Sequence, residues 1–187
     1  INKRLKTLFI HIPKTGGTSI ERALSFTGSV CDANKFPVPQ HFIGSRVEEQ
    51  YGTSIYNTYF VFTIVRNPYD RFLSSYMWRF RNAANPPSID EFINWVHELV
   101  TRNGYDTLPG GDHFRPQVEF IHKMNYIGRF ETLESSFKKV CDSIGIKNKS
   151  LPFRNKTRKI KPKLSTSQKD KIYSIYRLDF EEFNYLK

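Results

Sequence analysis

The stretch LFIHIPKTGGTSIERAL, residues Leu8–Leu24, decides the fold. The segment Thr7–Ile12 is largely apolar and predicts a short buried strand, of the kind found in the centre of a parallel sheet. A proline and two glycines follow, and a helix is expected from about Thr18 to Ser25. The stretch therefore predicts a strand, a tight loop and a helix in succession.

The same succession is expected further along the chain. Thr58–Val65 is rich in β-branched and aromatic residues and is the strongest strand signal. Pro68 follows at a position typical of the first turn of a helix. The remaining expected elements are helices within residues 43–52, 88–104, 132–145 and 165–183 and a short strand within residues 124–130. The alternation predicts a single α/β domain over residues 1–187, P-loop-kinase-like, with three layers: a central parallel sheet and helices on both faces.

The composition restricts the partners. The 187 residues carry a formal net charge of +11, which favours an anionic partner such as nucleic acid, an acidic glycan, an anionic membrane or a nucleotide. Six basic residues and no acid lie within residues 154–163, as a solvated segment or as a lid over a charged ligand. No apolar run approaches the ~18–20 residues of a membrane span. Cys31 and Cys141 show no metal-ligand spacing, so no metal site is expected; two free thiols and one disulfide both remain open.

The loop after the first strand has the composition of a phosphate-binding loop. Gly16 and Gly17 let the main chain approach an anion, and Lys14 adds a full positive charge. Thr18 and Ser19 can donate hydroxyl hydrogen bonds and cap the helix. The ATP-binding pattern GxxxxGK[ST] is not met, because the lysine precedes the glycines. The alternative is a simple turn with a solvated lysine.

The second candidate site is VRNPYDRFLSSY, residues 65–76. Arg66 ends the strongest strand, and Ser74 follows about two helical turns later. A guanidinium and a hydroxyl at this spacing suit the oxygens of a phosphate group. Alternatively, Arg66 pairs with Asp70 or another acidic residue to fix the turn. Arg71 is expected to be structural or exposed.

Both motifs resemble those of sulfotransferases that use 3′-phosphoadenosine-5′-phosphosulfate (PAPS). PKTGGTS resembles the loop that binds the 5′-phosphosulfate, and VRNPYDRFLSSY is similar to the motif that binds the 3′-phosphate. Further segments resemble the membrane-type carbohydrate sulfotransferases and their small bacterial relatives: HFRPQVEFI, IGRFETLESSF and IYRLDFEEFNY. The resemblance spans nearly the whole chain.

The resemblance implies roles for individual residues. Lys14 would stabilise charge on the departing nucleotide, and Arg66 and Ser74 would hold the 3′-phosphate. Arg154 lies where related enzymes close a loop over the nucleotide. The phosphosulfate would be bound by Lys14, Thr15, Gly16, Gly17, Thr18 and Ser19. The product would be 3′,5′-ADP, and no metal is required.

A histidine is the expected general base for the acceptor hydroxyl. His41 lies some 25 residues before Arg66, where related carbohydrate sulfotransferases often carry a catalytic histidine. The alternative is a histidine that bonds to its own backbone at a helix start. His113 is a candidate for acceptor binding or an alternative base, and Glu48 and Glu49 are weaker options. His11, inside the first strand, is expected to be structural.

The sequence thus favours a PAPS-dependent transfer of a sulfuryl group to an acceptor hydroxyl, most readily of a carbohydrate. The alternatives are a nucleotide or nucleoside kinase of related fold, transfer to a phenol, lipid or tyrosine, and a non-catalytic relative of these enzymes. A nucleic-acid-binding module is a further alternative, which no base-reading motif supports. Loop aromatics could stack on an acceptor or pack locally: Phe36, Phe42, Tyr105 and Phe114. Compartment and oligomeric state are not indicated.

Overall fold

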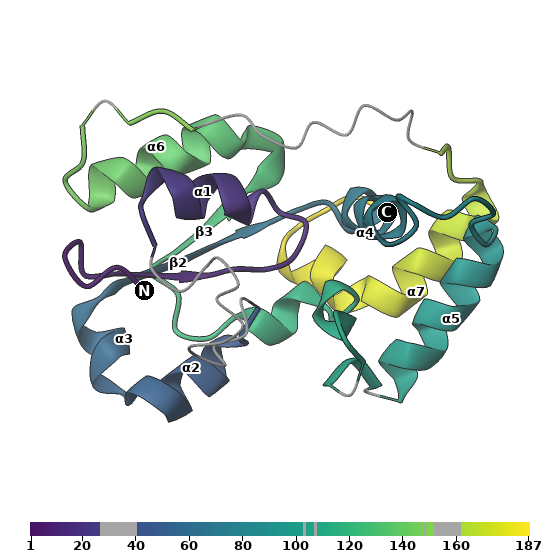
Figure 1. The fold of residues 1–187 in the computed structure, drawn as a ribbon, viewed down its shortest axis with the longest axis horizontal. Coiled ribbons are helices and arrows are strands. Elements are labelled where there is room, and N and C mark those ends of the chain that lie inside the picture. The colour runs from purple at the N-terminus through teal and green to yellow at the C-terminus, as the bar shows by residue number, and fades with distance from the viewer. Residues whose placement is uncertain (27–40, 103, 107, 148, 152–161) are drawn as a thin grey trace. The chain divides into compact units, whose positions relative to one another are not determined.

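The computed structural model describes residues 1–26, 41–102, 104–106, 108–147, 149–151 and 162–187 (Figure 1). The chain divides into two compact units. Unit 1 comprises Ile1–Val65 and Glu119–Lys156, and unit 2 comprises Arg66–Val118 and Thr157–Lys187. The expectation of one domain over the whole chain stays a prediction.

Unit 1 is built on a parallel sheet of three strands in the order β1-β2-β3. The strands are β1 (Thr7–Ile10), β2 (Phe60–Val65) and β3 (Tyr126–Arg129). In the register, Phe62 of β2 pairs with Phe9 of β1 and with Tyr126 of β3. The predicted α/β fold with a parallel sheet is therefore confirmed, with β1 ending two residues before the expected Ile12.

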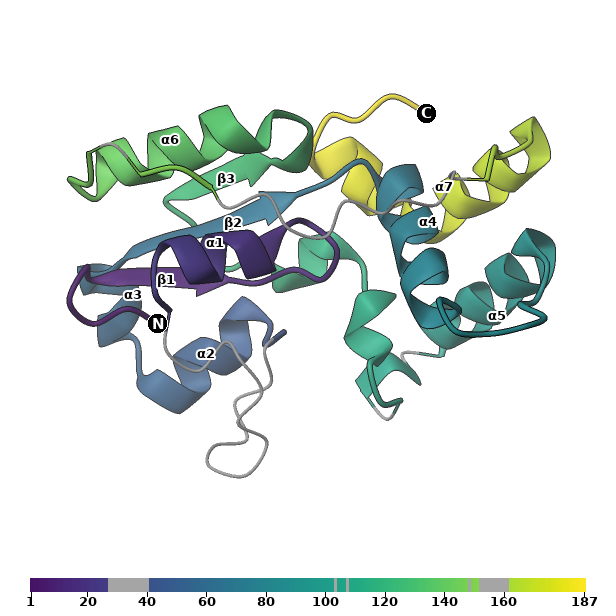
Figure 2. The same ribbon diagram turned by 45° about the horizontal axis from the view of Figure 1, so that its top comes forward.

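Helices cover both faces of this sheet (Figures 1 and 2). One face carries α1 (Gly17–Ala23) and α6 (Leu133–Ser143), and the other carries α2 (Gly44–Tyr51) and α3 (Ser54–Thr58). The first face is sealed by buried apolar side chains of the sheet, α1 and α6, among them Phe9, Phe62, Ile64, Ile20, Phe137 and Val140. The sequence did not predict α3, a five-residue helix whose N-cap has no side-chain hydrogen bond.

Unit 2 is helical. It contains α4 (Pro68–Arg79), α5 (Ile89–Thr101) and α7 (Thr166–Glu182), whose apolar faces form one core. The core residues include Phe72, Leu73, Phe92, Ile93, Val96, Phe114, Ile172, Tyr176 and Phe180. Short 3-10 helices lie at Gly104–Asp106 (η1) and Gly111–His113 (η2). A third, Gln117–Phe120 (η3), begins in unit 2 and ends in unit 1, and a fourth, η4 (Phe130–Thr132), lies in unit 1.

The helix starts follow the sequence signals. Pro68 occupies the first turn of α4, where the Asn67 side chain accepts hydrogen bonds from Tyr69 N and Asp70 N. Ser88 with Glu91 and Ser165 with Gln168 form the expected capping boxes of α5 and α7. Because each cap bonds main-chain groups that a helix leaves unpaired, these starts are fixed locally.

Some predictions fall outside the described residues, namely those on Arg154, Cys31 and Phe36. Cys141 is buried in the unit 1 core, where burial raises the pKa of its thiol. None of the helices within the described ranges is long and apolar enough to span a membrane.

Candidate active site

The loop between β1 and α1 has an unusual main-chain conformation. Lys14 adopts a φ of +68° and Gly16 a φ of +85°, both in the left-handed region. For lysine this conformation costs on the order of 1 kcal/mol or more, and such strain gathers at functional sites. The loop therefore holds Lys14 in a conformation that its own preferences do not explain.

Buried contacts fix the loop from inside. Thr15 is fully buried, and its hydroxyl donates to Ile12 O at 2.8 Å. A Cβ atom on Gly16 would lie 2.9 Å from Leu133 Cδ2 and 3.1 Å from Phe130 Cε2. The Thr15 hydroxyl therefore stabilises the loop itself. Thr15 would bind an anion through its main-chain N–H group.

Gly16 is the N-cap of α1, and no described side chain caps this helix. The expectation that Thr18 and Ser19 cap it is wrong, because the left-handed Gly16 starts the helix at Gly17 and places both residues inside the first turn. Ser19 N already donates to Gly16 O at 3.1 Å. Because no described side chain caps the helix, the main-chain N–H groups that precede Ser19 in this turn can bind an anion.

His11 lies directly under this turn. Its ring is so close to Gly17 that a Cβ there would lie 2.2 Å from His11 Nε2. Its Nδ1 lies 2.6 Å from Oε1 of Glu21 on α1, and both side chains are buried. His11 was expected to be structural and inside the first strand; it lies one residue beyond the end of β1, and its buried ring supports the turn as a structural residue would.

His41 is anchored to the same turn. Its Nδ1 lies 2.9 Å from the main-chain oxygen of His11, and the two rings meet edge to face at 4.7 Å. Since a carbonyl oxygen only accepts, Nδ1 carries the hydrogen, and in the neutral ring Nε2 is the basic nitrogen. Nδ1 of His41 therefore bonds to main chain 30 residues away and not to its own backbone.

Glu48 is a poor candidate for the base. Its carboxylate lies 2.5 Å from His122 Nε2 and 2.6 Å from Lys123 Nζ. Hydrogen bonds from Lys123 and then His122 lower the pKa of Glu48 to about 2. A carboxylate with so low a pKa binds protons weakly. Glu49 is exposed on the same helix.

Arg66 and Ser74 both belong to unit 2. Arg66 is buried, at 8% exposure, directly after β2, and Ser74 is half-buried on α4. The next residue, Ser75, is buried and its hydroxyl donates to His113 O at 3.2 Å. Ser75 therefore ties α4 to the loop that carries His113, while Ser74 retains solvent access.

Two residues that the sequence analysis did not single out hold the main chain at Arg66. Gln117 Oε1 accepts from Arg66 N, and Gln117 Nε2 donates to Arg66 O, each at 2.9 Å. Asp179 of α7 accepts from Gln117 N and Val118 N, each at 2.9 Å. Burial raises the pKa of Asp179, against the lowering effect of Arg71 and of the N–H donors. The one sequence signal for these residues was that Gln117 lies in HFRPQVEFI and Asp179 in IYRLDFEEFNY, two segments that resemble the family.

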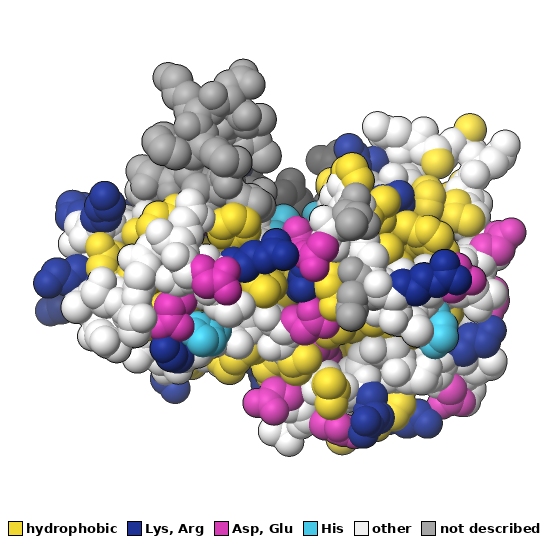
Figure 3. Space-filling model, turned by 90° about the horizontal axis from the view of Figure 1, so that it is seen from below, with side chains coloured by type: hydrophobic (Ala, Val, Ile, Leu, Met, Phe, Trp, Pro, Cys, Tyr) yellow, Lys and Arg dark blue, Asp and Glu magenta, His cyan; other side chains and the backbone are white. Residues whose placement is uncertain are grey.

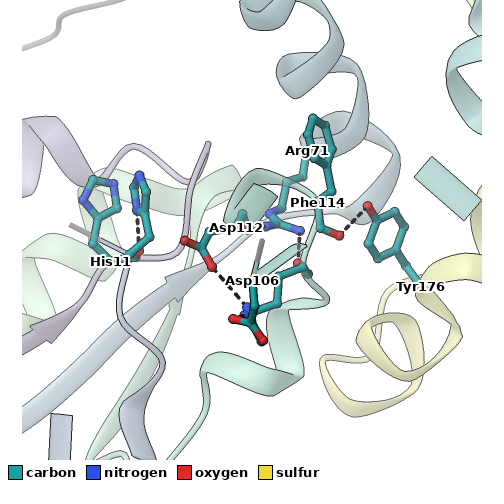
Figure 4. A network of polar contacts seen from close by, with 8 residues as sticks. His11, Arg71, Asp106, Asp112, Phe114 and Tyr176 are labelled. Carbon is teal, nitrogen blue, oxygen red and sulfur yellow. Dashed lines mark hydrogen bonds and ion pairs between the residues drawn. The ribbon is translucent and has the colours of Figure 1, made fainter. Parts of the chain in front are cut away.

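Arg71 was expected to be either structural or exposed, and it is structural. It is buried, and its guanidinium donates to Arg115 O at 2.9 Å (Figure 4). Arg115 is buried as well, pairs with Asp106, and stacks its guanidinium over Tyr105 at 4.0 Å. Because Tyr105 and Phe114 are 5% and 1% exposed, the suggestion that they stack on an acceptor is wrong; both pack in unit 2.

His113 is half-buried and stacks on Trp78, with ring centroids 4.3 Å apart. Trp78 is 38% exposed, so part of this pair reaches solvent. An indole beside an imidazole offers both an apolar ring edge and a hydrogen-bonding nitrogen to a ligand. The pair is compatible with acceptor binding by His113.

The surface charge is mixed where it can be viewed. On the face in Figure 3, Lys and Arg side chains stand among Asp and Glu side chains, and the described residues there form no continuous basic field. Among the described residues, no three His, Cys, Asp or Glu side chains gather as metal ligands would. The segment of highest basic density, residues 154–163, lies mostly outside the described residues.

Comparisons with known proteins point to one family. A profile described as the sulfotransferase family matches residues 1–186. Carbohydrate sulfotransferase 11 from Mus musculus is 21% identical over 225 aligned residues, which cover 95% of this chain and 64% of the mouse protein. An uncharacterized protein from Archaeoglobus fulgidus is 30% identical over 113 residues, covering 58% of this chain and 83% of the archaeal protein. This chain thus spans less than two thirds of the mouse protein's length. No solved structure matches at a significant level.

Proposed function

The chain belongs to the sulfotransferase family, and we propose that it transfers a sulfuryl group from PAPS to an acceptor hydroxyl by in-line displacement. The observation that carries this proposal is the loop between β1 and α1. There Lys14 is held in a left-handed conformation beside a helix start that no described side chain caps. Such a loop offers main-chain N–H groups and a full positive charge to one anion.

The nucleotide is bound by two sets of residues. Lys14 and the loop Thr15, Gly16, Gly17, Thr18 and Ser19 bind the 5′-phosphosulfate, with Arg154 as a further candidate. Arg66 and Ser74 bind the 3′-phosphate, for which a planar guanidinium is suited. This division extends the resemblance of the two motifs to these particular residues, and the main-chain geometry of the loop Thr15–Ser19 is compatible with it.

The transfer step balances as a single displacement. The acceptor oxygen forms a bond to sulfur while the bond from sulfur to the bridging oxygen breaks. The electron pair remains on that oxygen, so negative charge grows on the 5′-phosphate of 3′,5′-ADP. Lys14 and the N–H groups of the loop stabilise this charge in the transition state.

His41 takes the proton of the acceptor hydroxyl. Since its Nδ1 donates to His11 O, Nε2 carries the lone pair that accepts the proton. The hydrogen bond to main chain also fixes the ring's orientation. No step of this scheme requires a metal ion.

The acceptor that we propose is a carbohydrate, with His113 and Trp78 at its binding site. Support comes from the name of the mouse relative and from the net charge of +11, which favours an acidic glycan. The test is transfer of radiolabelled sulfate from PAPS to panels of glycans, phenols and lipids. Labelled glycan is expected, and label only on phenols or lipids would reject the carbohydrate acceptor. Failure to bind PAPS at all would reject the whole proposal.

A further inference from the structure

We propose that Gln117 and Asp179 are positioning residues for Arg66, and that they aim its guanidinium at the 3′-phosphate of the nucleotide. This inference rests on the proposed function, because it assigns a purpose to contacts around a nucleotide-binding arginine. The three residues are far apart in sequence and lie together within unit 2. None of the motif matches gave Gln117 or Asp179 a role.

The Gln117 amide holds both main-chain groups of Arg66. It accepts from Arg66 N and donates to Arg66 O at 2.9 Å each, as a neighbouring strand would. Gln117 is fully buried and Arg66 is 8% exposed, so water cannot easily replace these bonds. The amide group therefore fixes the point from which the Arg66 side chain departs.

Asp179 in turn fixes the Gln117 amide. Its Oδ2 accepts from Gln117 N at 2.9 Å and from Gln117 Nε2 at 3.3 Å, while Oδ1 accepts from Val118 N at 2.9 Å. A carboxylate has no hydrogen to donate, so Nε2 must face Asp179 and Oε1 must face Arg66 N. Asp179 thus selects the one amide orientation that can bond both groups of Arg66.

The arrangement matters because an arginine recognises phosphate through geometry. Two parallel N–H groups must meet two phosphate oxygens, so a displaced guanidinium loses affinity even though its charge is unchanged. Residues that orient metal-binding side chains contribute roughly 10–100-fold in affinity, and we expect support of a phosphate-binding arginine to act on the same scale. The 3′-phosphate is the part of the nucleotide that should report any such displacement.

The experiment compares the dissociation constants of 3′,5′-ADP and 5′-AMP, measured by calorimetry on the full chain. The ratio of the two isolates the contribution of the 3′-phosphate. In Gln117→Met, which keeps the side-chain length and loses both bonds, 3′,5′-ADP should bind roughly tenfold more weakly. The dissociation constant of 5′-AMP should stay unchanged, which a general loss of structure would not allow.

A matched control comes from the same helix as Asp179. Tyr176 is 3% exposed on α7, and its hydroxyl donates to Phe114 O at 2.9 Å (Figure 4). Tyr176→Phe removes one buried hydrogen bond without touching Arg66 or Gln117, so it should preserve the ratio. In an Arg66→Met background, Gln117→Met should weaken 3′,5′-ADP binding no further.

A second variant keeps the test informative if Gln117→Met does not fold. In Gln117→Glu, the ionised side chain cannot donate to Arg66 O, whereas the protonated one can. At each pH, the preference of this variant for 3′,5′-ADP over 5′-AMP is compared with the preference of the wild type. The variant's preference should approach the wild-type value as the pH falls. If the wild-type chain shows no preference for 3′,5′-ADP, the proposed function is wrong. If it does, and Gln117→Met, or Gln117→Glu at a pH where the new carboxyl is ionised, retains the wild-type ratio, the positioning role is wrong.

Discussion

The turn after β1 and the turn after β2 both lead from a parallel strand into a helix, but they are held in different ways. The first is fixed largely within itself, by Thr15 donating to Ile12 O three residues back and by the left-handed Gly16. The second has a local cap in Asn67 but depends on Gln117, 51 residues beyond Arg66. Asp179, a further 62 residues along the chain, completes it.

The difference shows which changes each turn should tolerate. Substitutions inside the first turn alter its main chain directly, and distant ones reach it through His11 and His41 or through Leu133 and Phe130, which lie against Gly16. The second turn should respond to substitutions far from it in sequence.

The largest effect is expected for His41→Ala, which removes the proposed base from the first turn. Loss of a general base typically lowers the rate by roughly 10²–10⁴. Sulfate transfer should fall by that factor, while the dissociation constant of 3′,5′-ADP stays near the wild-type value. Weaker 3′,5′-ADP binding with an unchanged rate of the bound complex would assign His41 to binding.

Lys14→Ala should follow, with transfer reduced by roughly 10²–10³ because the leaving phosphate loses a positive charge. The comparison between the turns is sharpened by Arg66→Met. That change should act on nucleotide affinity, whereas Lys14→Ala should act mainly on the turnover number. Steady-state kinetics with saturating PAPS separate the two, and near-normal turnover in Lys14→Ala would contradict the role of Lys14.

Gly17→Ala should destabilise unit 1 by about 1–3 kcal/mol, because its Cβ would lie 2.2 Å from the His11 ring. Gly145→Ala is the control, since no atom lies within 4 Å of its Cβ position and only the cost of a positive φ remains. Denaturant unfolding of both variants measures the difference. Equal destabilisation would show that the His11 ring is not tightly packed on the turn.

The smallest effect concerns Glu48, which contacts neither turn directly. The hydrogen bonds from Lys123 and His122 lower its pKa to about 2 in the folded chain, from an ordinary value of 4.5. This carboxylate therefore contributes stability above pH 4.5 that is lost as the pH falls toward 2. Glu48→Gln should be less stable than wild type at pH 7, and the gap should close at low pH. A gap that does not depend on pH would contradict the charge interaction.

The contrast between local and distant contacts also explains which features could be predicted from the sequence. The parallel sheet, the capped starts of α4, α5 and α7, and the turn containing Lys14 follow from neighbouring residues, and the structure has them. The side-chain caps expected from Thr18 and Ser19 failed because the left-handed conformation of Gly16 decided where α1 begins. Gln117 and Asp179 were out of reach, because their partners are set by tertiary contacts over 51 and 62 residues.

The most direct measurement of the central claim is the binding of nucleotides to the wild-type chain, compared across 3′,5′-ADP, 5′-AMP and Mg²⁺–ATP. A PAPS-dependent sulfotransferase should bind 3′,5′-ADP most tightly, without added metal, and Arg66→Met should reduce this affinity toward that of 5′-AMP. Tighter binding of Mg²⁺–ATP, or equal affinity for 3′,5′-ADP and 5′-AMP in the wild type, would contradict the account.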